Sequence, residues 1–305
     1  MVAGLNLAIT GATGFVGGRL LELALAEGYS VRALTRRPQQ DRGGVTWIDG
    51  SLDRPDSLAE LAAGADSVIH VAGVINAPDL AGFEAGNVTG TASMLDAAEV
   101  AGVKRFVHVS SLAAREPKLS AYGASKAGSE ALIGASPLSS AIVRPPAVYG
   151  PGDKETLELF KMAKRGFILL PPEGRLSLIH VDDLARLLLA LAEASAPKGL
   201  LVEPDDGRHR GWSHAEFGMA LGRALGRRVM TLPTPRPLLN LGARIDRLVR
   251  RDKAKLTADR VAYFCHPDWM VDPGRGAPET LWKPDIETEQ GLKSTVNWYR
   301  EAGWL

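Results

Sequence analysis

Three side chains near the middle of the chain have the types and the spacing to move a proton at a carbonyl or alcohol oxygen. Tyr122 and Lys126 stand four residues apart in the run S-A-Y-G-A-S-K-A, so a helix would place both on one face. A phenol of pKa about 10 is a poor acid-base catalyst at pH 7, and a neighbouring ammonium lowers that pKa because it favours the phenolate. Ser111 ends the run F-V-H-V-S-S, where its hydroxyl could hold the oxygen while Tyr122 transfers the proton.

Ser110 is the alternative to Ser111. Both stand at the end of the strand predicted over 104–110 and fall at the carboxyl edge of the expected sheet. Successive strand residues point to opposite faces, so only one of the two hydroxyls can serve this site.

A glycine-rich turn near the start of the chain could bind a phosphate. The run L-N-L-A-I-T-G-A-T-G-F-V-G-G predicts a buried strand, a turn through Gly11, Gly14 and Gly17, and a helix from Phe15. Gly11 would permit the tight turn, Gly14 the approach of a pyrophosphate, and Gly17 close packing of helix on strand. The spacing G-x-x-G-x-x-G is one residue longer in its first gap than the G-x-G-x-x-G fingerprint.

The end of the second predicted strand bears on the choice of dinucleotide. An acidic residue there would bind a ribose 2′-hydroxyl, whereas arginine accommodates a 2′-phosphate. Thr35 occupies that position, and Arg36 and Arg37 follow it. Two guanidinium groups favour NADP, and NAD is the alternative.

The elements that must position these residues alternate between strands and helices. Candidate strands cover 5–10, 29–35, 45–48, 67–72, 104–110 and 139–143, and candidate helices cover 15–27, 55–63, 79–102 and 120–135. This rhythm predicts an α/β fold with a Rossmann-type, doubly wound parallel sheet. We expect a dinucleotide-binding domain over 1–150 and a smaller substrate-binding lobe over 151–305, interleaved with the main domain.

Composition indicates a small-molecule partner. The 305 residues carry a net charge of +1, which gives no overall electrostatic case for nucleic acid or an anionic membrane. The single cysteine, Cys265, excludes an intramolecular disulfide and a cysteine-based metal cluster, and we expect no metal. Leu5 enters the first strand almost at once and no apolar run is long enough to span a bilayer, so we expect a cytoplasmic protein.

With these motifs assembled, the chain resembles the extended branch of the short-chain dehydrogenase/reductase superfamily, which contains epimerases, dehydratases and reductases. The motifs are T-G-A-T-G-F-V-G at 10–17, H-V-A-G at 70–73, N-V-T-G-T at 87–91, H-V-S-S at 108–111, Y-G-A-S-K at 122–126, R-P-P-A-V-Y-G-P-G-D at 144–153, I-H-V-D-D-L-A at 179–185, and the closing run from 291. The resemblance spans the whole chain.

The resemblance implies roles for individual residues. Ser111, Tyr122 and Lys126 match the catalytic residues, and Lys126 would also hold the nicotinamide ribose. Asn87 matches an asparagine implicated in helix geometry and proton relay, with a structural cap as the alternative. The residues expected to bind the dinucleotide are Gly11, Thr13, Gly14, Phe15, Val16, Gly17, Arg36, Arg37, Ser51, Leu52, Val71, Ala72, Gly73, Ser110, Tyr122, Lys126, Pro145 and Val148.

Other conspicuous side chains are expected to be structural. His70 should have its hydrogen bonds satisfied in the core, and His180 with Asp182 or Asp183 should cap a helix and pack the lobe. The aromatic residues of the terminal helix should close the core, namely Trp298, Tyr299 and Trp304.

Two departures from the family pattern bear on function. Gly50-Ser51-Leu52 stands where many relatives have an acidic G-D-L, and the gap from Ser111 to Tyr122 is short for a nucleotide-sugar epimerase. We therefore expect an NAD(P)-dependent oxidoreductase acting on a small carbonyl or alcohol substrate. The alternatives are an epimerase or dehydratase that retains its cofactor, and a non-catalytic dinucleotide-binding subunit resembling the accessory subunit of respiratory complex I. The sequence allows a monomer and a homodimer equally.

Overall fold

The computed structural model describes residues 5–193, 199–251, 254 and 256–305. The chain forms two compact units that exchange segments along the sequence. Unit 1 comprises Met1–Pro145, Leu184–Glu203 and Arg275–Lys283, and unit 2 comprises Pro146–Asp183, Pro204–Gly274 and Pro284–Leu305.

Unit 1 is built on a seven-stranded sheet in the order β11-β6-β5-β4-β1-β2-β3, in which every neighbouring pair is parallel. The strands are β1 (Asn6–Thr10), β2 (Ser30–Thr35), β3 (Val45–Asp49), β4 (Ser67–His70), β5 (Arg105–Val109), β6 (Ser140–Val143) and β11 (Leu200–Val202). This sheet confirms the predicted doubly wound fold. The strand order reverses beside β1, where such folds bind their ligands.

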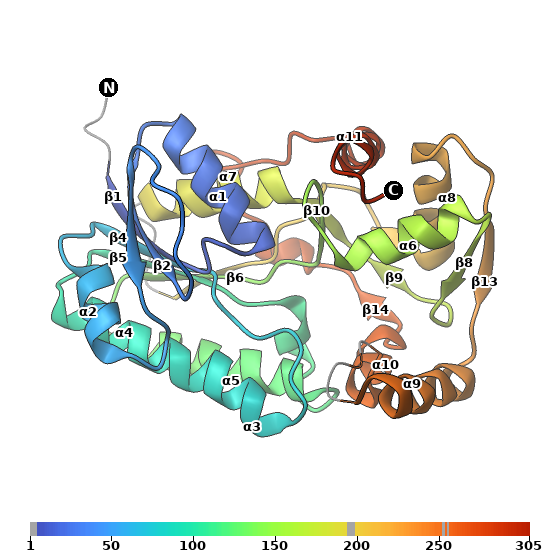
Figure 1. The fold of residues 1–305 in the computed structure, drawn as a ribbon, viewed down its shortest axis with the longest axis horizontal. Coiled ribbons are helices and arrows are strands. Elements are labelled where there is room, and N and C mark those ends of the chain that lie inside the picture. The colour runs from blue at the N-terminus through green and yellow to red at the C-terminus, as the bar shows by residue number, and fades with distance from the viewer. Residues whose placement is uncertain (1–4, 194–198, 252–253, 255) are drawn as a thin grey trace. The chain divides into compact units, whose positions relative to one another are not determined.

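Helices cover both faces of this sheet. They are α1 (Phe15–Ala26), α2 (Pro55–Ala62), α3 (Leu80–Phe83), α4 (Gly90–Val100), α5 (Ala121–Ala135) and α7 (Val181–Glu193), with a 3₁₀ turn at Leu112–Arg115. Figure 1 shows α1 and α7 on one side and α2, α4 and α5 on the other. On that second side, fully buried apolar side chains form the core, including Leu58, Leu61, Met94, Phe106 and Ile133.

The helix expected over 79–102 is interrupted. A π-helical segment, Glu84–Thr89, separates α3 from α4 and contains Asn87. Such segments admit one extra residue into a helical turn and often mark functional sites.

Unit 2 is a smaller assembly of short strands and helices. Its strands are β7 (Ala147–Tyr149) paired with β10 (Leu178–His180), β8 (Phe167–Leu170) paired with β13 (Met230–Pro233), and β12 (Trp212–Ser213), β9 (Arg175–Leu176) and β14 (Asp268–Trp269) in a third sheet. Its helices are α6 (Glu155–Lys164), α8 (His214–Ala224), α9 (Arg236–Arg250), α10 (Ala258–Phe264) and α11 (Thr288–Glu301), with a 3₁₀ turn at Pro273–Arg275 that crosses the unit boundary.

The predicted closing role of the terminal aromatic residues is confirmed. Tyr299 is fully buried and donates a hydrogen bond of 2.6 Å to the backbone oxygen of Asp153, and Trp298 and Trp304 pack against the same core. His180 is also buried and accepts a bond from the Asp182 amide, while Asp183 accepts bonds from the amides of residues 285 and 286. These contacts confirm the structural role expected of the I-H-V-D-D-L-A motif. Among the described residues, no helix is long and apolar enough to cross a membrane.

Candidate active site

The turn after β1 requires glycine at two positions. Gly11 has φ +75°, and a Cβ built on it would lie 2.8 Å from the Ala72 nitrogen. A Cβ on Gly17 would lie only 2.1 Å from the carbonyl oxygen of Gly11. The two glycines therefore let α1 begin directly against the end of β1.

The amino terminus of α1 fits a dinucleotide phosphate. Gly14 is the N-cap residue, and among the described residues no side chain caps the helix and no acidic residue occupies its first turn. Thr13 and Gly14 are exposed, whereas Phe15 and Val16 are half-buried. The first amides of the helix can therefore meet an anion, which the helix dipole attracts.

The loops after β2 and β3 meet at the same edge of the sheet. The Gly50 amide donates 2.8 Å to the backbone carbonyl oxygen of Thr35, and Arg36 and Arg37 follow in an exposed bend. The Ser51 hydroxyl donates to Asp53, and this bond and, more weakly, Arg36 lower the pKa of Asp53. Leu52 lies between Ser51 and Asp53 in the sequence and contacts Gly90, the first residue of α4.

Asp53 is a residue that the sequence reasoning missed. It stands two positions after Ser51, which occupies the place where many relatives have an acidic residue. Its position in the same short loop was the signal in the sequence that could have identified it. With Arg36 close enough to affect its pKa, it adds an acidic group to the predicted adenosine side.

The loop after β4 is fixed by a buried polar network. The Ala72 amide donates 3.1 Å to the Thr10 hydroxyl, which also bonds Nδ1 of His70 at 2.8 Å. Nε2 of His70 bonds the Thr91 hydroxyl at 3.1 Å. Burial lowers the pKa of His70 to about 3. The two hydrogen bonds of the ring confirm the prediction of a satisfied core histidine, and the network holds Val71, Ala72 and Gly73 in place.

Asn87 joins this loop to α5. Its Oδ1 accepts 2.6 Å from the Val74 amide, and its Nδ2 donates 2.9 Å to the Val74 oxygen and 2.9 Å to the Ser125 hydroxyl. Ser125 in turn donates 2.8 Å to the backbone carbonyl oxygen of Tyr122. The amide group of Asn87 is buried and engaged on both its atoms, which favours the structural alternative over proton relay.

Lys126 is a buried cation beside this cluster. Its side chain is 4% exposed, and Nζ donates 2.7 Å to the Val109 oxygen at the end of β5. Burial lowers the pKa of Lys126 to about 8, with Glu130 opposing the shift. A Cβ on Gly73 would lie 3.0 Å from Oδ1 of Asn87 and 3.7 Å from Nζ of Lys126, so a side chain there would crowd the Asn87 amide.

Tyr122 lies one helical turn before Lys126 on α5 and is half-buried. Its ring contacts Phe83 with centroids 6.1 Å apart. The next residue, Gly123, packs α5 so closely on the 3₁₀ turn that a Cβ there would lie 2.6 Å from the Ala113 oxygen. This close packing brings the first turn of α5, which carries Tyr122, against the 3₁₀ turn that Ser111 caps.

The structure separates the two serines. Ser110 donates to the buried carboxylate of Glu130, which Arg144 holds through two bonds of 2.8 Å and 2.6 Å. Ser111 caps the 3₁₀ turn by accepting 3.2 Å from the Ala113 amide. That bond leaves the hydroxyl proton of Ser111 available to a ligand. Glu130 was missed by the sequence reasoning, although it stands four residues after Lys126 on the same helical face.

The remaining predicted residues divide between the units. Pro145 ends the first segment of unit 1, and its oxygen accepts 3.1 Å from the Leu112 amide. Val148 lies on β7 in unit 2. Unit 1 therefore contains every predicted site residue except Val148.

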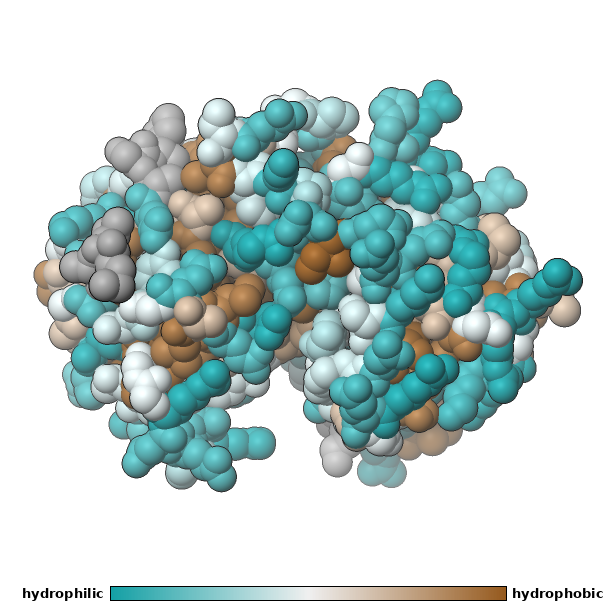
Figure 2. Space-filling model, turned by 90° about the horizontal axis from the view of Figure 1, so that it is seen from above, coloured by the Kyte–Doolittle hydropathy of each residue, from teal (hydrophilic) through white to brown (hydrophobic). Residues whose placement is uncertain are grey.

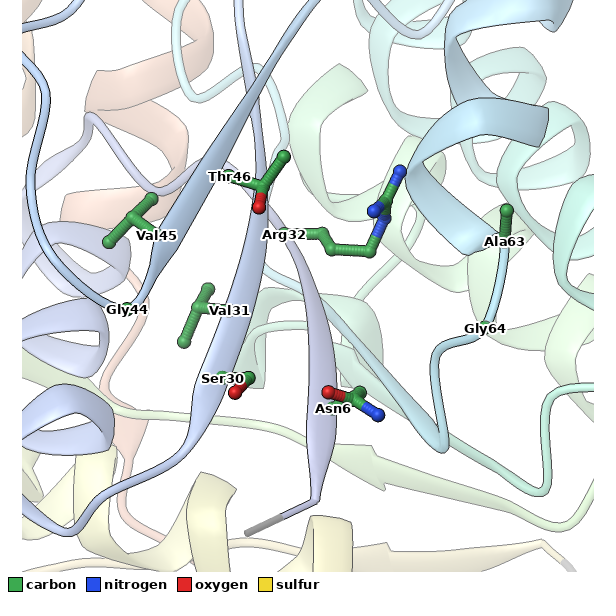
Figure 3. A pocket seen from close by; sticks show the side chains of 9 residues that line it. All are labelled: Asn6, Ser30, Val31, Arg32, Gly44, Val45, Thr46, Ala63 and Gly64. Atoms are coloured by element: carbon green, nitrogen blue, oxygen red, sulfur yellow. The ribbon is translucent and has the colours of Figure 1, made fainter.

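A hollow of about 400 Å³ lies at another edge of unit 1 (Figure 3). It is lined by the amino ends of β1, β2 and β3, with Arg32 reaching across towards Ala63. The glycine turn follows the carboxyl end of β1, so this hollow is distinct from the predicted dinucleotide site. The described residues contain no cluster of His, Cys, Asp and Glu side chains that could hold a metal ion.

Comparison with known proteins agrees with this geometry. A sequence model of the NAD dependent epimerase/dehydratase family matches residues 7–201, which include the glycine turn and the Ser-Tyr-Lys residues. The chain belongs to this family. Within the family, a ceramide reductase of Caulobacter vibrioides is 39% identical over 311 residues, covering 98% of this chain and 96% of the relative.

A more distant relative is also a reductase. The 2-alkyl-3-oxoalkanoate reductase of Stenotrophomonas maltophilia is 24% identical over 326 residues, covering 95% of this chain and 98% of that protein. Among solved structures, the Bordetella bronchiseptica enzyme WbmG in complex with NAD has a TM-score of 0.77 at 21% identity, over 99% of this chain and 96% of that one. These findings support an NAD-dependent oxidoreductase of the extended short-chain dehydrogenase/reductase type.

Proposed function

We propose that this protein is an NADPH-dependent reductase that converts a ketone of a long-chain, ceramide-type lipid into a secondary alcohol. The observation that carries the proposal is the 39% identity to a ceramide reductase across nearly the whole of both chains, with Ser111, Tyr122 and Lys126 in place. A ceramide contains a secondary alcohol, and a ketone is its oxidised counterpart. The more distant relative is named for a 3-oxo group on an alkyl chain, which fits the same substrate class.

The nicotinamide, when bound, would supply the hydride. Ser111 would donate a hydrogen bond from its hydroxyl group to the ketone oxygen, keeping its own proton, and so stabilise the charge that develops there. Tyr122 would give its phenolic proton to the same oxygen, because a ketone becomes an alcohol only when the oxygen is protonated. Lys126 would favour the phenolate left behind, since its buried ammonium lies on the same face of α5.

Asn87 and Gly123 would position the catalytic side chains without contacting the substrate. Asn87 ties the turn of α5 that carries Tyr122 to the loop after β4, and Gly123 allows α5 to approach the turn that carries Ser111. Glu130, which Arg144 holds in place, accepts the hydrogen bond of the Ser110 hydroxyl, so that Ser111 alone would serve the substrate oxygen.

The preference for NADPH rests on Arg36 and Arg37. Thr35 cannot accept two ribose hydroxyls as a carboxylate would, and its hydroxyl is already bonded to the Arg37 backbone. The two exposed guanidinium groups beyond it can pair with a 2′-phosphate. Calorimetric titration with NADPH and NADH tests this preference. We expect tighter NADPH binding, which R36A/R37A removes while the exposed control R42A leaves it unchanged.

The activity itself is tested by following NADPH absorbance with a ceramide-type ketone. One NADPH should disappear for each alcohol formed. An enzyme that recycles a retained dinucleotide would convert its substrate without net NADPH consumption, and a binding subunit would convert nothing. Either result would refute the reductase.

A further inference from the structure

Helix α9 of unit 2 exposes an unusual apolar stripe. Leu238, Leu241, Ile245, Leu248 and Val249 are 58%, 51%, 53%, 80% and 76% exposed. Their spacing places them on one side of the helix over its whole length. By contrast, apolar side chains on the face shown in Figure 2 form small separate patches among hydrophilic ones. Soluble monomers rarely leave a continuous stripe of this kind open.

The opposite sides of α9 are occupied differently. Ala243 is buried, and Asp246 accepts 2.9 Å from the Leu256 amide, so this side packs on the segment that leads to α10. Arg244 and Arg247 lie around the helix between this packed side and the apolar stripe. Residues 236–251 contain five arginines and a single acid, Asp246, which pairs with Arg250 at 3.3 Å.

The arginines are arranged beside the stripe. Arg244 and Arg247 follow one another at helical spacing, and Arg244 borders Leu248 around the helix. The whole chain is almost neutral, with 36 basic and 35 acidic residues, so the positive charge of α9 is a local concentration. An exposed apolar stripe flanked by arginine is the pattern of a helix that lies in a membrane interface.

We propose that α9 binds the surface of an anionic lipid bilayer, with its apolar stripe among the acyl chains and its arginines among the phosphates. A second copy of the chain fits this face less well, because a two-fold contact between identical faces would bring one set of arginines against another. The inference goes beyond the proposed reductase activity and requires no turnover.

Sedimentation with lipid vesicles tests the proposal on the full-length chain. Vesicles would contain either equal phosphatidylglycerol and phosphatidylcholine or phosphatidylcholine alone, at about 0.05 M and about 0.5 M sodium chloride. We expect binding to the anionic vesicles, weakened at high salt. Failure of the wild-type chain to bind them, or equal binding to both vesicle types, would overturn the proposal.

Two pairs of variants locate the binding. L241S/I245S should lower the partition coefficient about tenfold or more, while V100S/M219S removes exposed apolar side chains elsewhere and should leave it unchanged. R244Q/R247Q should lower it roughly fivefold for each arginine, with R42Q/R165Q as the charge-matched control. Calorimetric NADPH titration would show that each variant is folded.

Light scattering tests the alternative in which the stripe contacts a second copy of the chain. If the wild-type chain is a dimer that L241S/I245S converts to monomers, the stripe is a contact between copies and the membrane proposal is wrong. Equal vesicle binding by the α9 variants and their controls would likewise overturn it.

Discussion

Replacing Lys126 by methionine should stabilise the fold while it removes the activity. The side chain is buried, and its pKa is lowered from 10.5 to about 8 because burial penalises the ammonium. Keeping that charge at pH 7 therefore costs the folded state about 3 kcal/mol relative to water. Methionine has a similar length and no charge, but it gives up the bond to the Val109 oxygen, worth about 1 kcal/mol. The K126M variant should be about 2 kcal/mol more stable at pH 7.

The pH dependence of the free energy of unfolding provides a second test of the sign of this effect. The folded-state pKa lies below the unfolded one, so the cost is fully present below about pH 8 and disappears as the pH rises through 10.5. The stability of the wild-type chain should therefore approach that of K126M between these values. Over the same range K126M should show no such gain.

Urea unfolding of both proteins at pH 7 and pH 10 measures the difference, and NADPH oxidation measures the rate. We expect turnover to fall by roughly 10²–10⁴. The control K104M removes an exposed lysine that pairs with Asp66, and should change stability by less than about 1 kcal/mol at either pH. If K126M were less stable than the wild type at pH 7, or if the difference were constant with pH, the argument from burial would be refuted.

Four further substitutions test the network around the site. Ser111→Ala should lower kcat/KM about 100-fold with little change in urea midpoint, and an equal rate would exclude the residue from catalysis. Ser110→Ala should leave kcat/KM nearly unchanged and lower the free energy of unfolding by about 1–3 kcal/mol, because Glu130 loses a buried partner. An unchanged urea midpoint would argue against this hydrogen bond. Gly17→Ala should abolish calorimetric NADPH binding, since its Cβ would meet the turn at 2.1 Å, and retained affinity would contradict that packing. Because the pKa of His70 is lowered from 6.5 to about 3, the histidine should cost about 1.4 kcal/mol of stability per pH unit as pH falls between these values; an equal slope in His70→Asn would contradict this.

The main fold was predictable because its signals are local. Alternating apolar runs and helical patterns located six of the seven strands of the large sheet to within a few residues, but β11, which joins the sheet from Leu200–Val202, was not predicted. The interruption around Asn87 was not predictable, because the π-helical segment coincides with bonds from Asn87 to Val74 and Ser125, which lie 13 and 38 positions away.

The candidate site was likewise predictable from the sequence only in part. Strand alternation correctly predicted that Ser110 and Ser111 differ, but their assignment depends on Glu130 and Arg144, whose contacts only the folded chain reveals. Net charge gave no reason to expect a membrane partner, because it averages over the chain and hides the arginines of α9. The helical spacing of leucines and arginines over 236–251 was the signal in the sequence that could have found this helix.

The most direct test of the central claim is NADPH consumption with a ceramide-type ketone by the wild-type chain and by Tyr122→Phe. The phenylalanine keeps the ring beside Phe83 and removes only the phenolic hydroxyl group. The account predicts one NADPH oxidised per alcohol formed, and a rate at least about 100-fold lower in the variant with NADPH binding retained. Conversion without net NADPH loss, or an undiminished rate in Tyr122→Phe, would contradict it.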